Sequence, residues 1–215
     1  TLSSSSAASD VYKRQITYGS VCSGIEAASV AWVGLDMKAA WFSQFDPEHN
    51  YARGQDFPSA VLAKHWPDIE NLGDMTKIAE RIIAGEVAAP DVVVGGTPCQ
   101  AFSVAGSRAG LSDARGQLTL SYVELANAID KKRESEGKSP AVFIWENVPG
   151  VLSSKDNAFG CFLGALSGED DQLIAPGKKW SNAGCVFGPQ RTISWIIKDA
   201  QYFGVAQRLS LIHIS

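Results

Sequence analysis

Gly95-Gly96-Thr97-Pro98-Cys99-Gln100 follows directly on residues 90–94 (Pro-Asp-Val-Val-Val), a short apolar run that is typical of a buried strand. Later in the chain a second apolar run, residues 141–145 (Ala-Val-Phe-Ile-Trp), leads into Glu146-Asn147-Val148-Pro149-Gly150. Ligands of open α/β sheets bind at the carboxyl ends of the strands, so we expect the Cys99 thiol and the Glu146 carboxyl to face one pocket. This pair suits covalent attack on an electron-poor ring, with the carboxyl managing the proton of a ring nitrogen.

Strand-like and helix-like segments alternate along the rest of the chain. Helices are expected at residues 26–33, 57–65, 75–84 and 117–133, and strands at residues 17–22, 38–45, 71–74, 90–94, 141–145 and 192–199. This alternation predicts βαβ units in an α/β fold, with a mostly parallel sheet. Residues 170–181 are interpreted as a surface loop, and the run Lys131-Lys132-Arg133 as solvated surface.

The composition fits one globular domain with a sizeable core, because 45% of the 215 residues are hydrophobic and 20% are charged. No apolar run is long enough to cross a membrane and no signal-peptide pattern is evident, so a cytoplasmic protein is expected. The formal net charge of −4 is unlike that of a free-standing DNA-binding protein. If DNA is the substrate, a local basic surface or a further part of the protein must supply the phosphate contacts.

The four cysteines show neither a Cys-x-x-Cys pair nor metal-ligand spacing with the three histidines, so we expect reduced thiols and no metal site. Free cysteine is mostly a thiol at neutral pH, and a nucleophilic Cys99 therefore needs a lowered pKa. The alternatives for Cys99 are a buried structural thiol or a spare surface residue. Its place after a strand and beside a proline favours function, whereas the structural interpretation is kept for Cys22, Cys161 and Cys185.

Pro98-Cys99-Gln100 and Glu146-Asn147-Val148 resemble the two signature motifs of DNA (cytosine-5) methyltransferases. The resemblance continues, in the order of the family, through residues 102–106, 110–116 and 199–208, and is closest to bacterial and prophage modification methylases. It implies a Rossmann-like S-adenosylmethionine-dependent methyltransferase fold with helices on both faces of the sheet and its C-terminal part missing. It also implies methyl transfer from S-adenosylmethionine to C5 of cytosine in double-stranded DNA, by a monomer.

The resemblance assigns catalytic roles to five residues. The Cys99 thiolate is expected to attack C6 of a cytosine that has been flipped out of the duplex. Glu146 is expected to hydrogen-bond N3 and the exocyclic amine, after which C5 takes the methyl group. Asn147 is expected to brace the loop that carries Pro98 and Gln100; its alternative is a simple turn residue.

The resemblance places the cofactor at the ends of the first strands. Residues 22–25 stand where the Phe-x-Gly-x-Gly loop of the family wraps S-adenosylmethionine, although Glu26 and Ala27 replace later glycines. Gln44 takes the position of a carboxylate that binds the ribose hydroxyls, and its neutral amide is expected to bind them more weakly. The expected cofactor contacts are Cys22, Ser23, Gly24, Ile25, Gln44, Phe45, Asp74, Met75 and Pro98.

Plainer interpretations of these positions stay open. Gly24 can be an ordinary tight turn, and Phe45, which matches the aromatic residue that stacks on the adenine, can be a core residue. Asp46 is a nearby substitute for the carboxylate that Gln44 lacks. Asp74 can be the N-cap of the helix that follows, with or without a cofactor contact.

DNA contacts are expected from the Gly-, Ser- and Arg-rich residues 100–116, which resemble the active-site loop that closes over DNA in the family. Solvated surface arginines are the alternative interpretation. The residues assigned to DNA are Ser103, Arg108, Arg115, Gln207 and Arg208.

The two ends of the chain are expected to be non-native. Residues 10–15 can be encoded by GATGTGTATAAGAGACAG, whose reverse complement translates to residues 209–214 and resembles a transposon end used to fragment DNA for sequencing. We therefore interpret residues 1–15 as a non-native leader, 16–208 as a partial catalytic domain and 209–215 as a non-native tail that is apolar enough to form a strand. Two arginines of the family fall on Leu209 and Leu211, and the target-recognition region is missing, so the fragment is expected to be inactive alone.

Two other functions compete with this interpretation. One is a non-catalytic module that binds S-adenosylmethionine or pairs with a polypeptide bearing the missing half. The other is an unrelated cysteine hydrolase, which is disfavoured because no histidine lies near Cys99 in the sequence.

Overall fold

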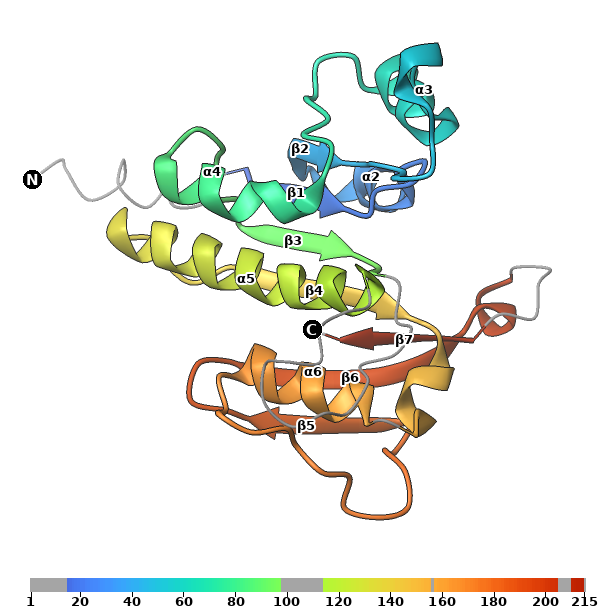
Figure 1. Cartoon of the computed structure of the whole chain (residues 1–215), viewed down its shortest axis with the longest axis vertical. Coiled ribbons are helices and arrows are strands. Elements are labelled where there is room, and N and C mark those ends of the chain that lie inside the picture. The colour runs from blue at the N-terminus through green and yellow to red at the C-terminus, as the bar shows by residue number, and fades with distance from the viewer. Residues whose placement is uncertain (1–14, 98–113, 156, 205–209, 215) are drawn as a thin grey trace, which may run out of the picture.

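A computed structural model describes residues 15–97, 114–155, 157–204 and 210–214, and side chains are described for these residues except 114–117 and 210–214. The described strands form one seven-stranded sheet in the order β2-β1-β3-β4-β7-β6-β5 (Figure 1). The strands are β1 (Thr17–Val21), β2 (Lys38–Ser43), β3 (Val92–Gly95), β4 (Val142–Asn147), β5 (Ala183–Phe187), β6 (Thr192–Asp199) and β7 (Ser210–Ile214). The α-helices are α2 (Ala27–Trp32), α3 (Phe57–His65), α4 (Ile78–Ala84), α5 (Ala114–Ser135) and α6 (Ala158–Ser167).

Short 3-10 turns link several of these elements: η1 (Val33–Leu35), η2 (Tyr51–Arg53), η3 (Met75–Lys77), η4 (Pro149–Ser153) and η5 (Ala200–Phe203). Strands β2, β1, β3 and β4 pair in parallel, whereas β7 is antiparallel to both β4 and β6, and β5 is antiparallel to β6. The predicted α/β fold with a mostly parallel Rossmann-like sheet is confirmed. The apolar tail forms β7, between β4 and β6.

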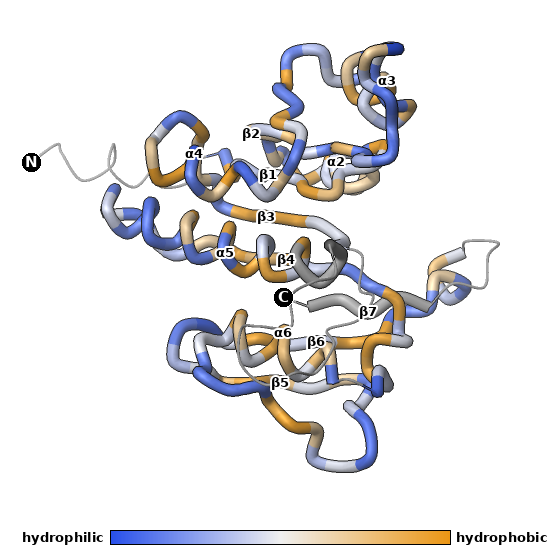
Figure 2. The backbone as a smooth tube through the Cα atoms, in the orientation of Figure 1, coloured by the Kyte–Doolittle hydropathy of each residue, from blue (hydrophilic) through white to orange (hydrophobic). Residues whose placement is uncertain are grey.

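Helices cover both faces of the sheet, because successive residues of a strand point to opposite sides. Val21 and Trp41 pack in one cluster with residues of α4, α5 and α6, whereas Tyr18 and Phe42 pack on the other side with Leu62 of α3. Helices α5 and α6 lie along the same face (Figure 1), and apolar and polar residues alternate along α5 (Figure 2). Among the described residues, no helix is both long and apolar enough to cross a membrane.

Residues 71–74, expected as a short strand or the end of one, form no strand and make one isolated parallel bridge, between Asn71 and Phe42. The Asn71 side chain instead hydrogen-bonds the backbone of Gln44. Its Oδ1 accepts from Gln44 N at 2.9 Å and its Nδ2 donates to Gln44 O at 3.2 Å. The Asn71 amide therefore bonds the backbone N–H and carbonyl oxygen of Gln44, which a neighbouring strand would otherwise pair.

Helix α6 and strand β5 are absent from the elements predicted from the sequence. Helix α6 contains Gly160 and Gly164, which lower helix propensity. A Cβ at position 160 would lie 2.0 Å from the backbone oxygen of Leu173, so glycine lets the returning chain pack directly on the helix. The residues of β5, Ala-Gly-Cys-Val-Phe, show no alternation of apolar and polar types, although exposed and half-buried residues alternate along the strand.

Arg133 is buried, and the interpretation of Lys131-Lys132-Arg133 as solvated surface is wrong for this residue. Its side chain is 3% exposed, and its Nη2 lies 2.9 Å from Asp91 Oδ1. The remaining donors reach backbone oxygens, from Nε to Ser139 at 2.7 Å and from Nη1 to Ala89 at 3.1 Å. Local sequence hides this role because the partners lie on other elements.

The Asp91 carboxylate joins the starts of β1 and β3 to the end of α5. Besides Arg133, it accepts from Thr17 N and Thr17 Oγ1, both at 2.9 Å. Burial by itself would raise the pKa of Asp91, but the bonds from Thr17 and Arg133 outweigh burial and lower it.

Replacing Arg133 by alanine should lower the free energy of unfolding by about 3–5 kcal/mol, because Asp91 is left without its buried partner. Urea denaturation measures the loss. Lys132→Ala is the matched control: Lys132 pairs with the solvated Glu136, so little change is expected. Equal losses in the two variants would contradict the structural role of Arg133.

Stability should fall in acid partly through Asp91. A folded-state pKa below the unfolded value of about 3.9 means that this contribution is present above that pH and is lost as pH falls through the folded pKa. The difference in unfolding free energy between the parent and Asp91→Asn should therefore shrink between pH 5 and pH 2. A difference that stays constant in pH-dependent denaturation would rule out this linkage.

Candidate functional site

Strands β1, β3 and β4 end at one edge of the sheet. Val21 pairs with Gly95, and Gly95 pairs with Trp145, so the segments that follow these three residues are neighbours. Gly96 lies directly against Glu146, because a Cβ at Gly96 would be 2.7 Å from Glu146 Oε2. Glycine at position 96 thus leaves room for the half-buried carboxylate at the end of the next strand.

Thr97 is fixed by three side chains on neighbouring elements. Asn147, which is buried, donates from Nδ2 to the backbone oxygen of Thr97 at 2.8 Å. The Thr97 hydroxyl accepts from Trp145 Nε1 at 2.9 Å and lies 3.1 Å from the hydroxyl of Thr119 in α5. The bond from Asn147 is made to the residue before Pro98, and its expected bracing of the loop that carries Pro98 and Gln100 stays a prediction.

Several predicted site residues lie outside the described part of the chain, and their roles stay predictions. For Arg115, the backbone lies in α5 and only the side chain falls outside that part. The other residues in this group are Pro98, Cys99, Gln100, Ser103, Arg108, Gln207 and Arg208.

The turn after β1 is bonded to the end of β2. Ser23 N donates to Ser43 O at 3.2 Å, and Ser43 N donates to Ser23 Oγ at 3.1 Å. Gly24 has a left-handed backbone (φ 55°), and its N–H donates to Gln44 Oε1 at 2.9 Å. Ile25 is exposed. The predicted cofactor residues 23–25 and Gln44 are therefore brought together.

Glu26, which stands where the family resemblance places a glycine, has a left-handed backbone. Its φ of 65° lies in the left-handed region, which costs a non-glycine residue on the order of 1–2 kcal/mol. The carboxyl is 1% exposed and caps α2, accepting from Ser29 N at 3.1 Å and Ser29 Oγ at 3.0 Å. Oε2 has no hydrogen-bond partner among the described residues, and burial raises the pKa of Glu26.

Cys22 behaves as a structural thiol. It is partly buried, and its Sγ donates to the Sδ of the buried Met75 at 3.3 Å. Burial, with a smaller contribution from the charge of Asp74, raises the pKa of Cys22 to about 11. Asp74 caps the η3 turn by accepting from Thr76 N at 3.0 Å, as its N-cap interpretation predicts.

Phe45 is not a core residue, since it is 45% exposed. Its ring stacks on Tyr51, with ring centres 5.3 Å apart and planes inclined by 3°. Asp46 is exposed, and its Oδ1 accepts from Glu48 N at 2.9 Å in a local turn; its role as a substitute for the carboxylate that Gln44 lacks stays a prediction.

Sequence reasoning missed Asp56, which accepts from Gln44 Nε2 at 3.0 Å and caps α3. An aspartate directly before Phe57-Pro58 is an N-cap signal, and that signal was available in the sequence. The described residues contain no group of three or more His, Cys, Asp or Glu side chains that could hold a metal ion.

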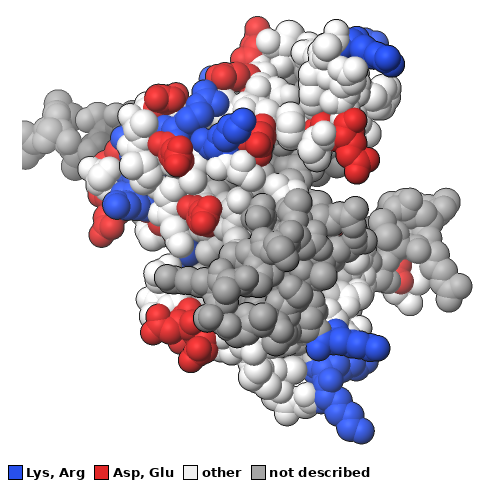
Figure 3. Space-filling model, viewed as in Figure 1, with Lys and Arg blue, Asp and Glu red and all other residues white. Residues whose placement is uncertain are grey.

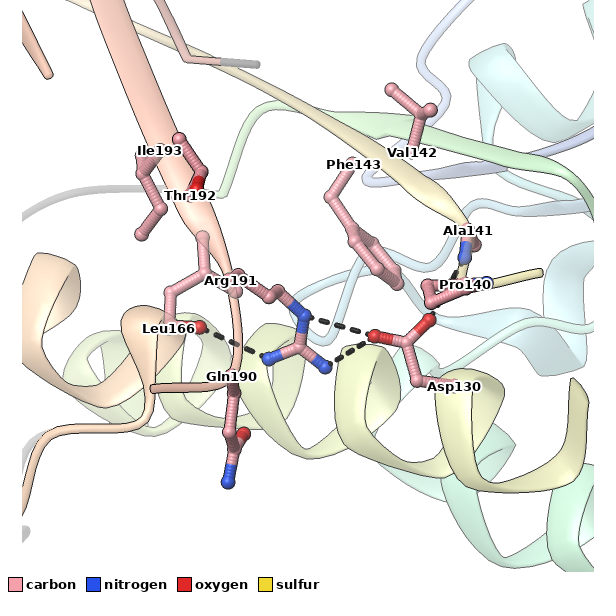
Figure 4. Close-up of a pocket in the computed structure, with 10 residues that line it drawn as sticks. All are labelled: Asp130, Pro140, Ala141, Val142, Phe143, Leu166, Gln190, Arg191, Thr192 and Ile193. Atoms are coloured by element: carbon pink, nitrogen blue, oxygen red, sulfur yellow. Dashed lines mark hydrogen bonds and ion pairs between the residues drawn. The ribbon is translucent and has the colours of Figure 1, made fainter. Parts of the chain in front are cut away.

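A cavity of about 310 Å³ lies at the opposite edge of the sheet, between the first residues of β4 and β6 (Figure 4). The charged residues that line it form an ion pair with each other: Arg191 donates from Nε and Nη2 to Asp130 Oδ2 at 3.0 and 2.8 Å. The Arg191 guanidinium also lies 5.2 Å from the ring centre of Phe143. The cavity is thus remote from Glu146.

Acidic and basic side chains are mixed over the upper part of the surface in Figure 3, above helix α5. The described part of this face shows no continuous basic track there. Such a distribution agrees with the negative net charge of the chain.

Known proteins resemble this chain over most of its length. It is 55% identical to a protein of Escherichia phage P1 named DNA N-6-adenine-methyltransferase, over 91% of this chain and 28% of that protein. It is 38% identical to the type II methyltransferase M.NgoBV of Neisseria gonorrhoeae, over 72% of this chain and 31% of the relative. The chain thus spans less than a third of the length of these relatives.

Solved structures share the fold. The Dnmt2 methyltransferase of S. pombe superimposes with a TM-score of 0.56 over 94% of this chain and 49% of that chain, at 13% identity. The Dnmt2 protein of Spodoptera frugiperda gives a TM-score of 0.54 at 17% identity, over 93% of this chain and 49% of that one.

The family model for C-5 cytosine-specific DNA methylases matches residues 16–209, which is most of the chain. The family and these structural neighbours support S-adenosylmethionine as the cofactor. Because this match covers more than half of the chain, the chain belongs to the family of C-5 cytosine-specific DNA methylases.

Proposed function

We propose that this chain carries the methyl-transfer part of an enzyme that methylates C5 of cytosine in double-stranded DNA. The observation that carries the proposal is the side-by-side ending of β3 and β4. It brings Gly96 against Glu146 and lets Asn147 hold Thr97, two residues before the proposed nucleophile Cys99. A nucleophile and an acid on such adjoining segments suit addition to a pyrimidine ring.

The residues after β1 and β2 fit the cofactor of the family. Apart from Gly24 and its two chain neighbours, no described residue has an atom within 4 Å of where a Cβ of Gly24 would stand, so the backbone there is open to a ligand. Phe45 offers an exposed ring for an adenine, and the Gln44 amide lies beside Gly24. When bound, S-adenosylmethionine supplies the electrophilic methyl group.

The proposed chemistry uses Cys99 and Glu146 in turn. The Cys99 thiolate would form a bond to C6 while Glu146 hydrogen-bonds N3, and the electron pair shifted to C5 would take the methyl group from the sulfonium, whose methyl–sulfur bond breaks to leave S-adenosylhomocysteine. The proton on C5 then leaves, and the C6–sulfur bond breaks to regenerate the thiolate and the aromatic ring. The target base must first leave the duplex.

The name of the phage P1 relative points to N6 of adenine, and this is the second candidate reaction. That name describes a protein of which only 28% is matched by this chain. Methylation of an exocyclic amine needs no thiol adduct, because the nitrogen attacks the methyl group directly. The Cys99 and Glu146 motifs therefore favour cytosine.

A partner-dependent role follows from the length of the relatives. The chain spans 28% and 31% of the two relatives described above, so residues that read DNA belong elsewhere in the proposed whole protein. We propose that this chain alone binds cofactor but does not turn over.

The chain should bind S-adenosylhomocysteine in isothermal titration calorimetry, with Phe45→Ala weakening binding because the adenine loses its stacking surface. Loss of an aromatic stack of about 1 kcal/mol corresponds to roughly fivefold in Kd. Val142→Ala, at an exposed position on another part of the sheet, is the control. Undetectable heat for the parent at roughly 1 mM ligand, the upper end of common substrate affinities, would contradict the cofactor site.

Co-expression with the region of the phage P1 relative that follows the matched segment should restore methylation of duplex DNA. Cys99→Ala should then lower the rate by at least about 10³-fold and Glu146→Gln by about 10²–10⁴-fold, as expected for a lost nucleophile and acid. Tritium transfer from labelled S-adenosylmethionine measures the rate.

Cys185→Ala is the matched thiol control, because Cys185 is exposed on β5 and should leave the rate unchanged. Nucleoside chromatography of the product identifies the base. N6-methyladenine in a reaction unaffected by Cys99→Ala would overturn the cytosine assignment, and turnover by this chain alone would overturn partner dependence.

A further inference from the structure

The carboxylate that binds the cofactor ribose in many nucleotide-binding folds is displaced in this chain. Such folds place an acidic residue about 20 residues after the glycine-rich turn, at the end of the second strand. Gln44 stands there, at the end of β2, and its side chain bonds the Gly24 turn. The negative charge is instead on Asp56, whose carboxylate accepts a hydrogen bond from the Gln44 side chain.

Asp56 is built into the fold as a buried anion. It is 2% exposed and its Oδ1 accepts from Ser59 N at 3.2 Å, which caps α3. Its Oδ2 accepts from Gln44 Nε2 at 3.0 Å. Burial alone would raise the pKa of Asp56, but the bonds from Ser59 and Gln44 outweigh it and lower the pKa. The carboxyl is therefore ionised at neutral pH.

Two neighbours impose one orientation on the Gln44 amide. Ionised Asp56 can only accept, so Nε2 must face it, and the Gly24 N–H can only donate, so Oε1 must face the turn. The two requirements agree. Each amide atom keeps unused capacity, one N–H on Nε2 and one lone pair on Oε1.

The backbone of Gln44 is held as firmly as its side chain. Asn71 bonds both Gln44 N and Gln44 O, and also donates from Nδ2 to Ser59 Oγ at 3.2 Å. Ser59 N in turn donates to Asp56 Oδ1. The end of β2, the start of α3 and the turn after β1 thus form one polar network around a single amide.

We propose that Asp56 is a positioning residue for the cofactor: it orients the Gln44 amide so that Oε1 accepts from a ribose hydroxyl of an adenosyl ligand. Asp56 also supplies, through Gln44, the negative charge that other folds place directly beside the ribose. This inference rests on the proposed cofactor site.

Variants that move the negative charge from position 56 to position 44 test the proposal, with S-adenosylhomocysteine as the probe in isothermal titration calorimetry. Asp56→Asn keeps a good N-cap for α3 but lets the amide pair reverse, and Gln44→Glu sets two carboxylates side by side. Each single variant should raise Kd about tenfold, the effect of one charge-assisted hydrogen bond. The double variant returns one carboxylate and one amide to the pair, and its Kd should fall to within about threefold of the parent.

Deoxyribose analogues separate positioning from general structural support. The 2′-deoxy and 3′-deoxy forms of S-adenosylhomocysteine should include one that binds the parent more weakly and loses no further affinity in Asp56→Asn. Thermal unfolding of that variant should match the parent, because asparagine caps helices as well as aspartate.

Two results would overturn the role of Asp56: a double variant that binds no better than the weaker single variant, or equal losses for the ribose and both deoxyribose ligands. A parent that binds no S-adenosylhomocysteine would contradict the cofactor site itself. The outcomes therefore distinguish failure of this inference from failure of the proposed function.

Discussion

The parallel pairing of β3 with β4 is the constraint on which the site depends. Four residue pairs, from Val92–Val142 to Gly95–Trp145, set the register, and β4 continues for two residues beyond the last pair, to Glu146 and Asn147. At the other end Asp91 accepts from Val142 N at 2.9 Å and binds the buried Arg133, so the register is held at both ends. A slip by one residue would turn the buried side chains of β4 to the opposite face.

The proposed cofactor site is held together by hydrogen bonds rather than by apolar packing. The turn after β1, the end of β2 and the start of α3 meet at Gln44, whose side chain and backbone are all bonded within the protein. Such a network is rigid because every buried member has a partner. Its charge resides on Asp56, away from the position where related folds carry it.

The turn after β1 places a non-glycine residue in a conformation that favours glycine. Glu26 adopts the left-handed conformation and its carboxyl caps α2. The cost of that conformation is of the same order as the free energy that a helix cap contributes, about 1 kcal/mol. The cap therefore offsets the cost of a side chain at this position.

The sequence by itself determined the α/β class, the positions of helix α3 and strand β6, and the motif residues after β3 and β4, because apolar periodicity and local turn signals are short-range properties. Only the tertiary structure decided the burial of Arg133, the bond between Gln44 and Asp56, and the packing of the chain against Gly160. These depend on partners from distant segments, which no local pattern encodes. Register and burial are set when the elements pack, and this packing gave each of these residues its role.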